Sequence, residues 1–310
     1  MTRQSVLWTL LDKVESVALT LWPMKFRGAT GYLFIAPALL LVGILLIGLG
    51  YMMEYSLHEL DTATYRLKEA YSFGNYLFFA EQPVYLRILL RTLLAATLVT
   101  FFTLLLAFPY AYVMVRTQSA LVRKLLLVSL FLPFFIGQVV RAYGWLIILG
   151  QQGIVNTLLV KMGLPTLDLI YNYGAVIFGL VQYMLPFAVL LIVPAVTAIS
   201  EDMELAAESL GANWIRTFRH VVLPMARPGL VGAGIVVFTL TMTDFAMPEI
   251  LGGGTTDFIA SAIYDSFFQL SNSGLGAALS MVLVAIGSLL VALVFWLTGA
   301  GTLSIRSEAP

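Results

Sequence analysis

The chain has 310 residues, of which 60% are hydrophobic and 11% charged, and its 17 basic and 17 acidic residues give a formal net charge of zero. A soluble domain carries about 25% charged residues, so this composition excludes a water-soluble globular enzyme and a disordered chain. It also excludes a nucleic-acid-binding protein, which needs an excess of basic residues to displace counterions from phosphate. A polytopic membrane protein remains.

The N-terminal segment, residues 1–27, has apolar residues at helical spacing, interrupted by Asp12, Lys13 and Glu15. This pattern predicts an amphipathic helix in the inner membrane interface, ended by Pro23, rather than a cleavable signal peptide. A frayed tail is the alternative. Residues 28–310 are predicted to form the transmembrane domain.

Six charge-poor runs follow, and each is long enough for a helix that crosses the hydrocarbon core, which takes roughly 20 apolar residues. A transmembrane β-barrel would instead show alternating segments of about 10 residues. We therefore predict an all-α polytopic membrane protein with six transmembrane helices, at about 31–53, 92–115, 125–149, 173–199, 229–250 and 275–299.

Basic residues gather on one side of the predicted membrane. Eleven of the 17 lie in the two terminal segments and in alternate loops, whereas the loops of the other side carry only Arg66, Lys68 and Lys161, with Arg87 and Arg91 at the start of the second helix. Cytoplasmic segments carry the excess of Lys and Arg, so both termini are expected in the cytoplasm.

Cysteine is absent, and His58 and His220 are the only histidines. A thiolate metal site is therefore excluded, and we expect neither a histidine-based metal cluster nor a histidine-based catalytic triad.

Two ionisable residues, Arg141 and Asp244, lie deep inside predicted helices. A charge in the membrane is costly and usually has a partner. Our hypothesis is that the two approach each other near a translocation pathway. The alternatives are that backbone carbonyls or water satisfy each of them separately, or that the pair only holds helices together.

Further polar and aromatic side chains lie at a comparable depth. Aromatic faces and carboxylates suit a cationic amine, although Tyr and Trp are also enriched at membrane interfaces in general. With Arg141 and Asp244, the candidate pathway residues are Tyr143, Trp145, Gln182, Tyr183, Phe245 and Glu249.

The loop 200–228, SEDMELAAESLGANWIRTFRHVVLPMARP, has dense mixed charge. Its pattern predicts two short helices joined at Gly211, which stops the first by taking the left-handed conformation. Pro224 is expected to end the second helix and Pro228 to begin the next membrane helix. Composition alone is also compatible with an ordinary amphipathic connector.

The order Ala-Ala, three residues, Gly, nine residues, Val-x-Leu-Pro in this loop resembles the cytoplasmic coupling loop of binding-protein-dependent ABC importer permeases. That family has Glu-Ala-Ala, three residues, Gly, nine residues, Ile-x-Leu-Pro. Val221 replaces the isoleucine and Leu205 the glutamate; Glu204 and Glu208 flank Leu205, and either is a candidate to take over its role. The residues that match the family are Ala206, Ala207, Gly211, Leu223 and Pro224.

Other stretches are similar to the spermidine/putrescine-type branch of the same family, although relatives that carry opines, phosphonates or other small solutes share them. These stretches are 131–133, 141–145, 150–156, 185–187, 244–249, 251–253 and 276–280.

The resemblance implies a type I ABC importer permease fold in a bacterial inner membrane. It also implies three kinds of partner: two cytoplasmic ABC ATPase subunits, a second homologous permease of different sequence, and a periplasmic or extracellular solute-binding protein. The solute would be a polyamine or a related amine- or opine-like compound, moved by alternating access.

The chain has no G-x-x-x-x-G-K-[ST] loop to cradle phosphates. ATP and Mg²⁺ are therefore expected on the partner ATPases, and no cofactor or catalytic residue on this chain. The residues expected to couple to an ATPase are Glu204, Leu205, Ala206, Ala207, Glu208, Gly211, Ala212, Trp214, Phe218, Leu223 and Pro224, with Trp214 and Phe218 as anchors in a partner groove.

A stand-alone channel or secondary transporter is the alternative function. It would need an internal proton or ion relay, for which only Arg141 and Asp244 lie deep enough. Association with an ATPase subunit separates the two functions.

Overall fold

The computed structural model describes residues 12–13 and 30–298, in two units, Met1–Glu54 and Tyr55–Pro310. The predicted interfacial segment 1–27 lies outside the described residues, except for Asp12 and Lys13, which are helical. The apolar helix α2 (Thr30–Ser56) begins in the first unit. Its last two residues belong to the second unit. It confirms the helix predicted at 31–53.

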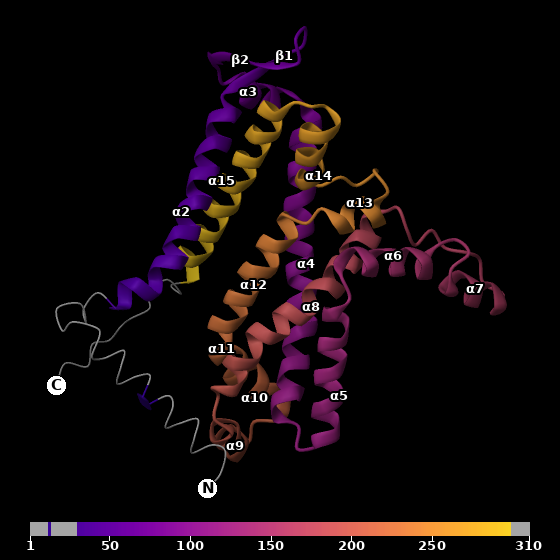
Figure 1. Cartoon of the computed structure of the whole chain (residues 1–310). Helices are drawn as coiled ribbons and strands as arrows, with labels where there is room; N and C mark the ends of the chain where they lie inside the picture. The colour runs from indigo at the N-terminus through magenta and orange to yellow at the C-terminus, as the bar shows by residue number, and fades with distance from the viewer. Residues whose placement is uncertain (1–11, 14–29, 299–310) are drawn as a thin grey trace. The chain divides into compact units, whose positions relative to one another are not determined.

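Four helices form the body of the second unit: α4 (Pro83–Arg116), α8 (Tyr173–Thr197), α12 (Arg227–Met242) and α15 (Ser273–Thr298). α4 packs along both α8 and α12 (Figure 1). Small side chains such as Ala95, Ala107 and Ala111 are fully buried on α4, which lets the helices approach closely. The helices predicted at 92–115, 173–199 and 275–299 are confirmed.

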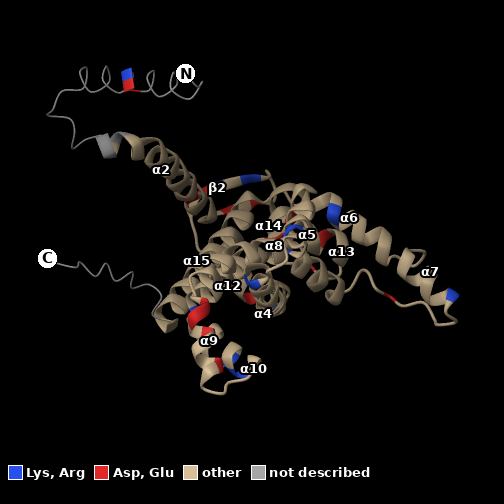
Figure 2. Cartoon of the chain, turned by 90° about the horizontal axis from the view of Figure 1, so that it is seen from below, with Lys and Arg blue, Asp and Glu red and all other residues tan. Residues whose placement is uncertain are grey.

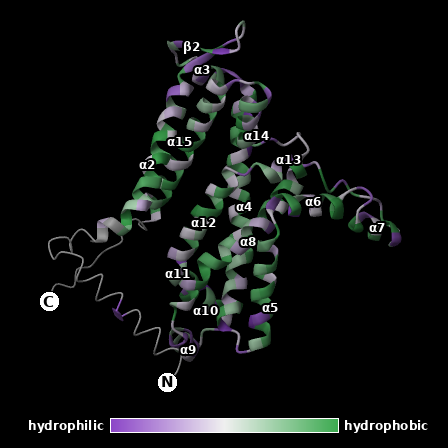
Figure 3. Cartoon of the chain, viewed as in Figure 1, coloured by the Kyte–Doolittle hydropathy of each residue, from purple (hydrophilic) through white to green (hydrophobic). Residues whose placement is uncertain are grey.

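The apolar surface of these helices lies between two polar ends (Figure 3). Residues 30–298 contain five helical segments that are long and apolar enough to cross a membrane. A sixth is present if Trp214–Met225 and Arg227–Met242, bent by 68°, count as one span. The all-α polytopic class is therefore confirmed.

The helix predicted at 125–149 is not continuous. The chain forms α5 (Ala120–Phe131), a 3-10 turn (Leu132–Phe135), α6 (Gln138–Leu149) and then α7 (Ile154–Lys161), and α6 and α7 run away from the bundle to one side (Figure 1). Pro133 lies in the break, where its missing N–H and its ring interrupt the helix.

The helix predicted at 229–250 is also interrupted. α12 ends at Met242, and α13 (Ala246–Gly252) begins after a gap that contains Asp244. The Asp244 carboxylate accepts a hydrogen bond from the Met247 N–H at 3.0 Å, and such local bonds favour helix ends over helix interiors. α14 (Ile259–Tyr264) and a π-helical turn (Asp265–Gln269) then lead to α15.

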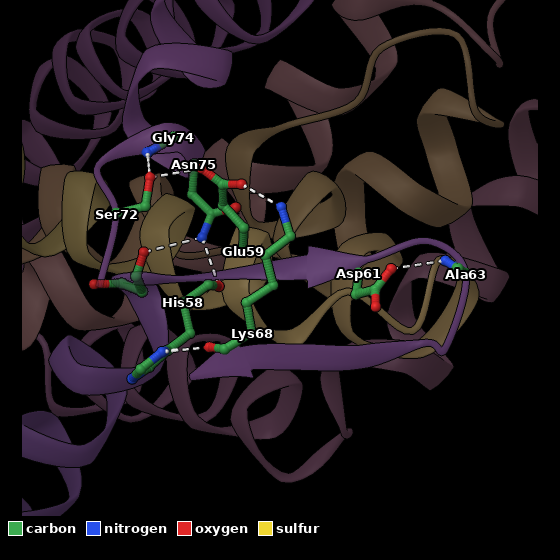
Figure 4. A network of polar contacts seen from close by, with 9 residues as sticks. His58, Glu59, Asp61, Ala63, Lys68, Ser72, Gly74 and Asn75 are labelled. Atoms are coloured by element: carbon green, nitrogen blue, oxygen red, sulfur yellow. Dashed lines mark hydrogen bonds and ion pairs between the residues drawn. The ribbon is translucent and has the colours of Figure 1, made fainter. Parts of the chain in front are cut away.

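At the end of the second unit opposite α9, the chain forms a small cap (Figure 1). It consists of β1 (His58–Asp61), the antiparallel β2 (Arg66–Tyr71) and α3 (Gly74–Glu81). Glu59 joins its parts, because its carboxylate accepts a hydrogen bond from the Ser72 hydroxyl at 2.6 Å and pairs with Lys68 at 3.0 Å (Figure 4).

The cap is expected to loosen in acid. The Ser72 hydrogen bond, followed by Lys68, lowers the pKa of Glu59. The contribution of Glu59 to the stability of the cap is therefore present above the pKa that a glutamate has in the unfolded chain. It is lost as the pH falls through the lower pKa that Glu59 has in the folded cap. A spin label on Thr62→Cys, at the exposed hairpin tip of a chain without cysteine, should gain mobility between about pH 7 and about pH 3.

The control is Glu59→Gln, whose label should already be mobile at neutral pH and should respond less to acid. A label that responds equally in both proteins would show that Glu59 does not govern the cap.

Candidate functional site

Two regions hold most of the residues that the sequence singled out: the loop 200–228 at one end of the second unit and the helix breaks around Asp244 (Figure 1). In the loop, α9 (Glu201–Ser209) begins at Ser200, whose hydroxyl caps the Asp202 N–H at 3.2 Å. Gly211 ends it with φ +84°. The predicted left-handed stop is confirmed, because only glycine takes this conformation routinely.

The second loop helix comprises α10 (Trp214–Thr217), a π-helical turn (Phe218–Val222) and α11 (Leu223–Met225). The expectation that Pro224 ends it is wrong. The helix runs through Pro224 and ends one residue later, at Met225. α12 then begins with Pro228 in its first turn, as predicted.

The carboxylate of Glu204 binds the end of α4. Its Oε1 accepts bonds from Arg116 Nη2 at 2.6 Å and Nε at 2.9 Å, and its Oε2 accepts one from the Tyr112 hydroxyl at 2.6 Å. Arg116 also donates to the carbonyl of Ile199 at 2.7 Å. The two charged side chains are only 15% and 12% exposed, whereas Glu208 is exposed.

Aromatic side chains make a second contact between the loop and α4. Phe218 lies 5.1 Å from Phe108 and 5.5 Å from Tyr112, measured between ring centroids, and Trp214 stacks on Phe218 at 5.4 Å. Phe218 is therefore packed against its own chain and half-buried, and its role as an anchor for a partner stays a prediction. Trp214 is 58% exposed and remains available.

The loop also exposes further apolar side chains, of which the sequence analysis selected only Leu205. Leu210 is 90% exposed and Ile215 65%, and Leu205, at the position of the family's glutamate, is 57% exposed. A hollow of about 440 Å³ separates the two loop helices and is lined by Ala207, Leu210, Ala212, Arg216, Thr217, His220 and Val221. Figure 2 shows acidic and basic residues side by side on α9 and α10. The combination suits a protein partner with an apolar contact and a charged rim.

The second region is a pocket of about 340 Å³ at the break between α12 and α13. Asp244 is only 7% exposed, and besides the Met247 N–H its carboxylate accepts a hydrogen bond from the Gln138 amide, at the start of α6. The pocket is lined by Gln138, Tyr183, Met184, Leu240, Thr243, Asp244, Phe245 and Ala246.

Arg141 does not form an ion pair with Asp244. Its guanidinium donates to the carbonyls of Pro133 and Ile136 in the helix break and lies 5.2 Å from the centre of the Tyr183 ring. The alternative hypothesis, separate satisfaction, is therefore the one observed. Tyr183 lies between them, because it contacts Arg141 and lines the pocket with Asp244.

The remaining candidates fall into separate surroundings. Trp145 donates to Gln182 at 3.4 Å and packs against Phe178, whereas Tyr143 and Glu249 are exposed. Of the predicted pathway residues, only Tyr183, Asp244 and Phe245 line the pocket. Sequence reasoning missed Gln138, whose one signal was an amide in an otherwise apolar run.

No metal centre accompanies either region: within residues 12–13 and 30–298, no three His, Cys, Asp or Glu side chains are grouped to hold a metal ion.

Residues 83–300 match the family of binding-protein-dependent transport system inner membrane components. The chain belongs to this family. It is a multi-pass inner-membrane protein and the permease subunit of an ABC importer. The matched residues run from α4 to α15 and include both the loop 200–228 and the Asp244 pocket.

The permease is similar to the spermidine/putrescine transport system permease protein PotB of Haemophilus influenzae, with 31% identity over 211 residues, 67% of this chain and 73% of the relative. The PotB of Escherichia coli is 29% identical over 238 residues, 76% and 85% of the two chains. The inner membrane ABC transporter permease protein YdcU of E. coli is 32% identical over 225 residues, 68% and 72%.

A solved structure of the bacterial alginate ABC transporter, in complex with an alginate pentasaccharide-bound periplasmic protein, has the same fold. The TM-score is 0.74 at 18% identity, over 90% of the permease and 96% of that chain. The predicted type I ABC importer permease fold is confirmed.

Proposed function

We propose that the permease moves a polyamine, or a related amine- or opine-like cation, into the cytoplasm. The observation that carries this proposal is the pocket at Asp244, where a carboxylate that is 7% exposed lies among the side chains of Tyr183, Phe245 and Gln138. Two of the similar relatives are named spermidine/putrescine permeases.

The chemistry of the pocket fits a cation better than an anion. A carboxylate makes charge-assisted hydrogen bonds to an ammonium group, and aromatic faces attract it through their quadrupoles. Gln138 now donates to Asp244, and an ammonium group would replace this neutral donor by a charged one. The volume of about 340 Å³ is in the range of small-molecule sites.

The loop 200–228 is proposed as the docking element for the ATPases. Its exposed Leu205, Leu210 and Trp214 would enter a groove of an ATPase subunit, and its basic and acidic residues would form the rim. Two ATPase subunits would bind ATP and Mg²⁺ and drive alternating access. With the loop in the cytoplasm, the termini are cytoplasmic as well.

The other partners are proposed from the family. A second, homologous permease of different sequence would complete the pore, and a periplasmic binding protein would deliver the solute. The β1–β2 cap, at the end opposite the loop (Figure 1), would then lie on the periplasmic side.

The test is uptake by proteoliposomes that contain the complete complex and the binding protein. We expect uptake of labelled spermidine that requires ATP inside, and competition by other polyamines. Competition by phosphonates alone would contradict the cationic solute. Uptake without ATP and without an ATPase subunit would contradict the ABC mechanism and favour a stand-alone transporter.

A further inference from the structure

We propose that α4 is the helix that transmits movement of the loop 200–228 to the Asp244 pocket, and that Arg116 and Glu204 are the positioning residues that connect it to the loop. The inference rests on the proposed docking role of the loop and names the helix through which docking would affect the pocket. The chain enters the loop from α8 and leaves it into α12, yet the loop's ion pair and ring contacts described above go to α4.

The inner end of α4 presents one continuous face to the loop. Phe108, Tyr112 and Arg116 are spaced by four residues, so they lie above one another on one side of the helix. Phe108 and Tyr112 contact the aromatic rings of the second loop helix, and Tyr112 and Arg116 bind Glu204 of α9. Both loop helices are therefore attached to the same end of α4.

The outer end of α4 is attached to the segment that follows the pocket. The hydroxyl of Thr92, which is fully buried, accepts a hydrogen bond from the Ile259 N–H at 3.0 Å. Arg91 donates to the carbonyl of Thr255 at 3.2 Å. Asp244 lies just before α13, and residues 255–259 follow α13. The outer end of α4 is therefore bonded to the segment that follows α13, beyond the break.

The body of α4 is suited to carry movement between these ends. Arg91 and Arg116 are 25 positions apart in one helix, a separation of about 38 Å. The helix is packed against α8 and α12 through fully buried residues such as Val99 and Thr103. Coupling over such distances is carried by packed, rigid elements, and α4 packs along α8 and α12, the two helices that run between the loop and the pocket residues Tyr183 and Leu240.

The replacement of the family's glutamate by Leu205 agrees with this arrangement. A shift of one residue turns a side chain by about 100° around a helix. The carboxylate therefore points inward from position 204 to Arg116, and the residue at 205 is an exposed leucine. In this chain the carboxylate serves the internal connection rather than the partner surface.

The test measures the pocket directly and does not depend on the solute. Thr243 is exposed at the pocket, and the chain has no cysteine, so Thr243→Cys can be labelled with a membrane-impermeant thiol reagent in the complete complex. We expect ATP with vanadate to change the labelling rate. Glu204→Gln and Arg116→Gln should reduce this change about tenfold, within the usual range of coupling energies.

Two controls separate transmission from folding and docking. The exchange Arg116→Glu with Glu204→Arg should restore part of the response, and Lys124→Gln, an exposed inner charge on α5, should leave it intact. The ATPase should still co-purify with every variant. A full response in Glu204→Gln, or loss of the ATPase from that variant, would overturn the inference; in the second case Glu204 acts in docking.

The outer end provides an independent test. Thr92→Val keeps the shape of the side chain and removes the acceptor for Ile259. If both ends act on one route, the double variant Thr92→Val/Glu204→Gln should lose little more than the worse single variant. Multiplicative losses would overturn the inference, whereas failure of the unmodified complex to bind an ATPase through the loop would overturn the proposed function itself.

Discussion

Replacing Gly211 with aspartate is expected to abolish transport while the permease still inserts into the membrane. Gly211 ends α9 with φ +84°, a conformation that costs a residue with a Cβ about 1–2 kcal/mol. A Cβ at this position would meet nothing within 4 Å, so the chain itself has room for the new side chain. The larger effect is expected at the interface, where a carboxylate next to the exposed Leu210 would lose its water when an ATPase docks.

Gly163→Asp is the matched control. Gly163 has φ +75° and equally open surroundings, but it follows α7 and is far from the loop in sequence. Uptake and co-purification of the ATPase should survive in Gly163→Asp and be lost in Gly211→Asp, with similar amounts of both proteins in the membrane. Equal losses would mean that backbone strain explains the effect, and normal uptake by Gly211→Asp would contradict the coupling role of the loop.

Asp244→Asn is expected to lower uptake of a cationic solute by about 10- to 100-fold, because a hydrogen bond to a charged group contributes about 1.5–3 kcal/mol. The asparagine oxygen can still accept from the Met247 N–H, so the start of α13 should be kept. The measurement is the concentration dependence of uptake at matched amounts of protein. Asp168→Asn, an exposed carboxylate before α8, is the control, and equal uptake by both variants would exclude Asp244 from the pathway.

Arg141→Gln should behave differently from Asp244→Asn. Arg141 is 8% exposed and donates to the carbonyls of Pro133 and Ile136 in the helix break, so its loss removes these charge-assisted hydrogen bonds and destabilises the fold. We expect less folded permease, with unchanged uptake per molecule. A change in solute preference would instead place Arg141 in the pathway.

The membrane spans could be predicted from the sequence, because length and absence of charge decide whether a helix can cross the membrane. The same criterion could not reveal the breaks at Pro133 and Asp244. Proline is tolerated inside other helices of this chain, such as Pro109 in α4 and Pro186 in α8. Whether a helix can break depends on which groups satisfy the backbone donors and acceptors that the break frees. At the break next to Pro133, Arg141 is such a donor.

The site was predictable only where its pattern is local. Gly211 and the two loop helices follow from residues a few positions apart. The Arg116–Glu204 pair joins residues 88 positions apart, and no periodicity connects them. Arg141 and Asp244 were predicted to be partners because both are charged and lie deep in the membrane. In the structure each has neutral partners instead: Arg141 binds backbone carbonyls and Asp244 binds the Gln138 amide.

The attachment of the loop to α4 also bears on how the complex assembles. Glu204 and Phe218 are fixed by Arg116, Tyr112 and Phe108 of the same chain, so the surface that we propose to dock an ATPase is ordered before that subunit binds. Ordering side chains on association costs about 0.5–1.5 kcal/mol for each flexible residue, and a preformed surface avoids this cost. The permease should therefore bind its ATPase in a single docking step, without folding of the loop, and keep the loop's shape when the ATPase dissociates.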